Sequence, residues 1–153
     1  MQDKREHYEI LLDKMALAHE QEFHLEASWI AYSILEDRLL SALKRSGGTT
    51  YPNGDDIRML GQKIQELIAR RAELNDQHAT GDKLLGAYFS LNLLDKLKDW
   101  KDRRNDLMHA MADSTKTIAE LSKETYLLSL DSKQIVKDTC NAARLLKKNR
   151  SKA

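Results

Sequence analysis

The sequence has little of what sheet proteins and disulfide-rich proteins require. Its 153 residues include one cysteine, one proline, six glycines and only 6% aromatic residues. The lone cysteine, Cys140, excludes an intramolecular disulfide and offers no metal-ligand spacing. Together with 41% hydrophobic and 32% charged residues, this composition is typical of a helical protein. We therefore expect an all-α fold.

Long apolar runs are also missing. The longest purely apolar stretches are a few residues, whereas a helix needs about 20 to cross a bilayer. The first ten residues, MQDKREHYEI, are charged where a secretory signal would be apolar. We therefore expect a cytoplasmic protein without a membrane partner. The net charge of +1 does not by itself indicate nucleic-acid binding, although basic residues gather at 96–104 and 144–153.

The length and the apolar periodicity predict one helical domain. A chain of this size buries a core of its own without disulfides or metals. We expect residues 1–148 to form a single bundle of about five helices and 149–153 a basic, disordered tail. Apolar residues at helical spacing place the helices at about 8–18, 23–44, 57 to an end near 75–82, 92–112 and 115–147, with a break near Asp131 as one option in the last.

The stretch WKDRRNDLMHAM, residues 100–111, places polar residues in a helix patterned for burial. At about 100° per residue, Arg104 is expected to project from the middle of an apolar stripe made by Leu97, Trp100, Met108 and Met111. Asn105 and His109 are four residues apart and share one flank, with Lys101 one turn earlier. An arginine cannot be neutralised, so its burial requires a carboxylate, a phosphate or a dense set of acceptors.

Glu36 is the internal candidate for a partner of Arg104. It falls within the predicted buried stripe of the second helix, which holds Leu25, Trp29, Tyr32, Leu35, Leu39 and Leu43. One reading is a buried salt bridge that only fixes the packing of two helices. The other is a carboxylate that positions a functional Arg104. The polar side chains of Asn105 and His109 favour the second reading, because a core salt bridge needs neither.

The segment RNDLMH, residues 104–109, resembles the signature of the HEPN superfamily, the "higher eukaryotes and prokaryotes nucleotide-binding" helical domains. Arg104, Asn105 and His109 match its Arg, polar and His positions, and Glu36 resembles an acidic position that many members carry on an early helix. The resemblance implies a HEPN-like bundle and a metal-independent endoribonuclease without a cofactor. Such members are typically toxins or phage-defence effectors that act as homodimers around an RNA-binding cleft, and a cognate antitoxin or inhibitor is a further expected partner.

The residue types suit that chemistry. Metal-free RNA cleavage uses the 2′-hydroxyl as nucleophile, and a histidine side chain, whose unperturbed pKa is about 6.5, can move a proton near neutral pH. His109 is therefore the candidate general acid or base. Arg104 can bind phosphate oxygens bidentately, and Asn105 can orient His109 or donate to a phosphate oxygen. Lys101 and Arg103 are candidate RNA-binding cations. The alternative is a non-catalytic module that binds a nucleotide or a partner, because some members of the family do not cleave RNA.

Two further patterns bear on the site. The segment HEQEFH, residues 19–24, resembles a zinc-protease motif, but its histidines are five residues apart, about 140° around a helix, so we exclude a metal site there. Phe23, Ile30 and Ile34 lie opposite the predicted stripe of the second helix. They are either covered inside the bundle or form a dimer interface.

Overall fold

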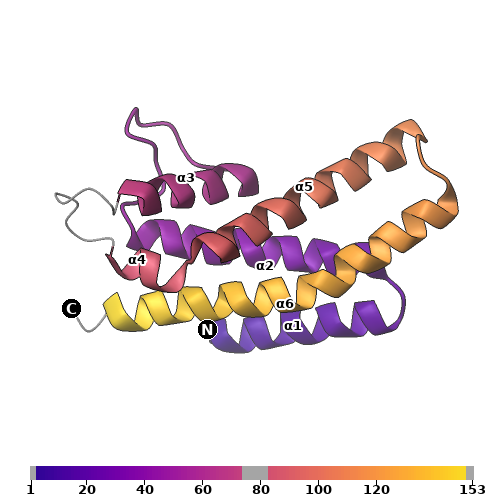
Figure 1. Cartoon of the computed structure of the whole chain (residues 1–153). Helices are drawn as coiled ribbons and strands as arrows, with labels where there is room; N and C mark the ends of the chain where they lie inside the picture. Colours follow the sequence, from indigo (N-terminus) through magenta and orange to yellow (C-terminus); the bar gives the residue numbers. More distant parts are fainter. Residues whose placement is uncertain (1–2, 74–82, 151–153) are drawn as a thin grey trace. The chain divides into compact units, whose positions relative to one another are not determined.

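The computed structural model describes residues 3–73 and 83–150, and this part of the chain is all α (Figure 1). Its one β pairing is an isolated bridge between Thr50 and Asp56. The predicted all-α fold is confirmed. None of the described helices is long and apolar enough to cross a membrane. The described helices are α1 (Lys4–Glu20), α2 (His24–Arg45), α3 (Leu60–Glu73), α4 (Lys83–Tyr88), α5 (Leu91–Asp113) and α6 (Ile118–Arg150).

The helix α6 is continuous through Asp131, so the break considered there is wrong. The segment contains no proline or glycine that would interrupt it. The Ser132 hydroxyl donates to the carbonyls of Leu128 and Ser129 and stays within the helical pattern. At its start, Thr117 and Glu120 bond reciprocally, a capping box that satisfies two free backbone N–H groups.

Two predicted features fall wholly or partly outside the described residues: the end of the third helix and the C-terminal tail. The expected end of the third helix, near 75–82, lies outside them, and so do residues 151–153 of the predicted tail. The other tail positions, 149 and 150, belong to α6.

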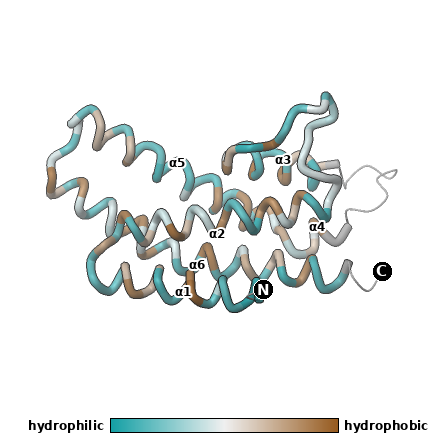
Figure 2. The backbone as a smooth tube through the Cα atoms, turned by 180° about the vertical axis from the view of Figure 1, so that it is seen from behind, coloured by the Kyte–Doolittle hydropathy of each residue, from teal (hydrophilic) through white to brown (hydrophobic). Residues whose placement is uncertain are grey.

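The described chain forms two compact units. The first contains the chain up to Ile34 together with Asp99–Val136, and the second contains Leu35–Lys98 and the chain from Lys137 onward. The helices α2, α5 and α6 contribute residues to both units. Hydrophobic and hydrophilic residues alternate along the helices, as expected for helices with one packed side (Figure 2).

In the first unit, the packed side of α2 is made by small residues and one isoleucine. Ala27, Ala31 and Ile34 are at most 1% exposed, whereas Trp29 is 64% exposed. The prediction that Trp29 belongs to the buried stripe is therefore wrong, because small side chains, rather than the largest one, face the neighbouring helices. The three residues predicted opposite that stripe differ in burial: Ile34 is covered within the chain, Ile30 is half-buried and Phe23 is exposed.

In the second unit, a buried arginine secures the turn after α2. Arg70 donates to the carbonyl of Leu43 at 3.0 Å, to the Ser46 hydroxyl at 3.2 Å and to the Gly48 carbonyl at 2.7 Å. Its Nε also pairs with Glu66 at 3.1 Å. All its charge-bearing groups are thus bonded, as a buried guanidinium requires.

Candidate functional site

The packed side of α5 in the first unit differs from the predicted stripe. Trp100, Leu107 and Ala110 are buried, whereas Met111 is 40% exposed. Trp100 also donates its Nε1–H to the Leu128 carbonyl at 3.2 Å and joins α5 to α6. The stripe predicted through Arg104 and Met111 is therefore wrong in its second half. The buried residues Trp100 and Leu107 are seven residues apart and mark the packed side of α5. Arg104 lies at the edge of that packed side.

Arg104 is half-buried, and an aromatic ring holds its guanidinium. The Cζ atom lies 4.1 Å from the ring centroid of Tyr32 on α2, a cation–π geometry. Its Nε is buried and has no hydrogen-bond partner among the described residues. Such a contact positions the guanidinium and leaves its charge un-neutralised, so its other nitrogens remain able to bind an anion.

Asn105 and His109 are exposed on one face of α5, as the four-residue spacing predicts. Arg104 and His109, however, are five residues apart on a continuous helix, and their side chains diverge by about 140°. The predicted site that joins Arg104 with Lys101, Asn105 and His109 stays a prediction.

The two candidate RNA-binding cations both have carboxylate partners. Arg103 lies 2.7 Å from Asp131 and 3.8 Å from Asp99, and Lys101 pairs with Asp102. These pairs are partly exposed to solvent, and exposed ion pairs contribute only about 0–1 kcal/mol. An RNA phosphate could therefore displace either carboxylate at a small cost.

Glu36 pairs with a lysine of its own unit. Its Oε1 lies 3.7 Å from Nζ of Lys63, a residue that is 6% exposed. Glu36 belongs to the second unit and Arg104 to the first. Its predicted role toward Arg104 stays a prediction.

The structure brings together two histidines that the sequence treated as separate. The rings of His19 and His24 are 5.1 Å apart, and each also packs against Tyr126, at 5.7 and 5.3 Å. His19 Nδ1 lies 2.7 Å from the hydroxyl of the buried Ser129. The signal for this cluster was the expected helix break: α1 ends at Glu20, and Glu22 has a φ of 65°, so the chain turns between the histidines.

Burial lowers the pKa of His19, and the nearby Lys133 and His24 lower it further, whereas Glu20 opposes them. The cause is the cost of placing a charged imidazole in this partly dry, cationic setting. His19 is therefore expected to be neutral near pH 7 and to keep its hydrogen bond to Ser129. Among the described residues, no group of three or more His, Cys, Asp or Glu side chains is arranged to hold a metal ion.

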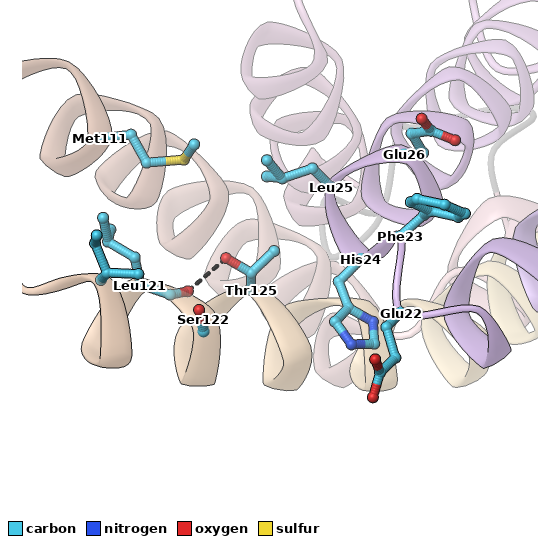
Figure 3. A pocket seen from close by; sticks show the side chains of 10 residues that line it. Glu22, Phe23, His24, Leu25, Glu26, Met111, Leu121, Ser122 and Thr125 are labelled. Carbon is cyan, nitrogen blue, oxygen red and sulfur yellow. Dashed lines mark hydrogen bonds between the residues drawn. The ribbon is translucent and has the colours of Figure 1, made fainter.

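A cavity of about 440 Å³ lies beside this cluster and is lined by the start of α2, the end of α5 and the start of α6 (Figure 3). Figure 3 shows Phe23 and Leu25 on one side and Met111 and Leu121 on the other. His24 also contributes to the lining. This cavity could not be predicted from the sequence, because its walls come from segments almost 90 residues apart.

The chain was compared with known proteins in three ways. A scan against protein-family models found no match, and searches of curated proteins and of solved structures found no significant match.

Proposed function

We propose that the chain is a metal-independent endoribonuclease of HEPN type that acts on RNA as a homodimer. The observation that carries the proposal is that the residues of its motif are exposed or only half-buried. Arg104 is held on the ring of Tyr32 with its charge available, and Asn105 and His109 are exposed to solvent. A motif that served only the core would be sealed from solvent with its charges paired inside the chain.

The divergence of Arg104 and His109 supports a composite site. One α5 helix directs the guanidinium and the imidazole to different sides, so a site that uses both needs groups from two chains. A two-fold dimer supplies two copies of each residue around one cleft. It also supplies the two proton-transfer groups that RNA cleavage requires, because each chain offers one motif histidine.

In this mechanism, one His109 takes the proton from the 2′-hydroxyl as its oxygen attacks the adjacent phosphorus. The bond from phosphorus to the 5′-oxygen breaks, and His109 of the partner subunit gives a proton to that oxygen. The products are a 2′,3′-cyclic phosphate and a free 5′-hydroxyl. Arg104 stabilises the charge that develops on the phosphate, and Asn105 donates to a phosphate oxygen or orients the imidazole.

A non-catalytic module that binds a nucleotide or partner is the second candidate. The charge of α5 favours this binding module, because the five basic and five acidic residues of the helix cancel each other's charge. Both flanking cations, Lys101 and Arg103, also have carboxylate partners. Electrostatic attraction of RNA to this helix is therefore weak.

The decisive experiment compares His109→Ala with His7→Ala, since His7 is an exposed histidine on α1. Each purified protein is incubated with uracil-rich, structured and transfer RNAs, with and without EDTA. His109→Ala should lower the cleavage rate by about two to four orders of magnitude, as expected for loss of a general acid or base. His7→Ala should cleave at the wild-type rate, and EDTA should have no effect.

Two results would contradict the proposal. Wild-type cleavage by His109→Ala would trace the activity to a contaminant or to another site, and the binding-module reading would then lead. A sedimentation experiment at micromolar concentration that shows only the 17.6 kDa species, with or without RNA, would exclude the composite site.

A further inference from the structure

We propose that the cavity lined by Phe23, Met111 and Ile118 is a docking site for a basic amphipathic helix of a partner protein. The inference does not rest on the proposed ribonuclease activity, because none of these residues belongs to the motif on α5. It rests on the apolar character of the lining, on the sign of its charge and on how open the lining is.

The lining gathers apolar side chains that remain exposed. Ile118 is 84% exposed, Phe23 54% and Met111 40%, and the half-buried Leu25 and Leu121 complete the apolar walls. These side chains come from the start of α2, the end of α5 and the first turns of α6 (Figure 3). A contiguous exposed apolar surface of this kind marks an interaction site more often than scattered single residues do.

The charge of the lining has one sign. Glu22 and Glu26 are exposed members of the lining, which includes no lysine or arginine among the described residues. The N-terminus of α2 contributes about half a positive charge, so the two carboxylates leave a net charge of about −1.5 at this edge. A partner that carries lysine or arginine beside its apolar residues is therefore attracted, and an acidic partner is repelled.

The openness of the walls favours a helix over a small molecule. Small-molecule sites bury roughly 70–90% of their ligand, which walls as exposed as Ile118 and Phe23 do not achieve. An amphipathic helix lays a row of apolar side chains along such a groove and covers the walls from outside. Its basic residues, on the flanks of that row, then lie near Glu22 and Glu26.

The test uses fluorescence anisotropy with a fluorescein-labelled, 18-residue amphipathic peptide of leucine and lysine. The reference peptide has glutamate in place of every lysine. The proteins are the wild-type chain, the double variant Phe23→Ser with Ile118→Ser, and the double variant Glu22→Gln with Glu26→Gln. The matched controls are Met59→Ser, an exposed apolar residue of the second unit, and Glu6→Gln, an acidic residue in the first turn of α1.

The wild-type chain should bind the lysine peptide at least about tenfold more tightly than the glutamate peptide. The serine double variant should weaken binding by about tenfold or more, and the glutamine double variant by about fivefold. Both controls should stay within about twofold of wild type. Circular dichroism at 222 nm checks that every variant keeps its helical content.

Three outcomes would overturn the proposal. The two peptides could bind equally, or the cavity variants could bind as the wild type does, or the lysine peptide could fail to bind at about 1 mM. Self-association of the wild-type chain that the serine double variant abolishes, without peptide binding, would assign the surface to a second copy of this chain instead.

Discussion

Replacing Trp100 by phenylalanine should destabilise the protein far more than the same change at Trp29. Trp100 is 1% exposed and donates to the Leu128 carbonyl, whereas Trp29 is 64% exposed. That carbonyl also accepts from the Ser132 hydroxyl at 3.1 Å, so Trp100→Phe does not leave it unpaired. The loss is then one net hydrogen bond, about 1 kcal/mol, and a cavity that costs about 1–2 kcal/mol more.

The expected total is about 2–3 kcal/mol for Trp100→Phe and less than about 0.5 kcal/mol for Trp29→Phe. Urea denaturation followed by circular dichroism measures both. With slopes of about 1–3 kcal/mol per molar urea for small proteins, the midpoint of Trp100→Phe should fall by about 0.7–3 M. The fluorescence of Trp29→Phe, from Trp100 alone, should lie at shorter wavelength than that of Trp100→Phe. Equal midpoints for the two variants would refute the reasoning and return Trp29 to the buried stripe that the sequence predicted.

Two further predictions concern the pH dependence of stability at His19 and the hydrogen bonds of the buried Arg70. Burial lowers the pKa of His19, so the unfolded chain binds more protons than the folded chain as the pH falls. The contribution of neutral His19 to stability is therefore present above the ordinary histidine pKa of about 6.5 and is lost as the pH falls below that value. His19→Gln should therefore reduce the fall in urea midpoint between pH 7.5 and pH 5.5, whereas His7→Gln should not. An unchanged pH dependence in His19→Gln would show that His19 does not cause this fall. Arg70→Met should cost about 3–5 kcal/mol because it leaves Glu66 without its charge partner. The exposed Arg58→Met should change the urea midpoint little, and a similar midpoint for both methionine variants would show that the Arg70 network contributes nothing.

The helices could be predicted from the sequence because apolar periodicity reports the formation of a helix directly. Which side of a helix is packed depends on the neighbouring helices, and here the apolar periodicity predicted the wrong side. On α2, the sequence offered Trp29 as part of an apolar stripe, but Ala27 and Ala31 face the packed side, because small residues let helices approach closely. A large apolar side chain is compatible with burial without requiring it.

The side of α5 that is buried also changes along the helix. Leu94 and Leu97 are buried in the second unit, and Leu107 and Ala110 in the first. One straight stripe drawn along the whole helix therefore placed Arg104 at its centre, whereas the packing of the first unit leaves that residue at an edge. No single-helix pattern contains this change, because it is set by which unit each half of the helix belongs to.

The five-residue spacing occurs twice in the chain with opposite results. On one helix, His19 and His24 would point apart by about 140°, but α1 ends at Glu20 and α2 begins at His24, so their ring centroids lie 5.1 Å apart. Arg104 and His109 both lie on α5, which runs unbroken through them, and about 140° separates their directions. Spacing alone thus decides a site only after the continuity of the helix is known. This is why the rings of His19 and His24 meet within one chain, whereas Arg104 and His109 lie on different sides of one helix.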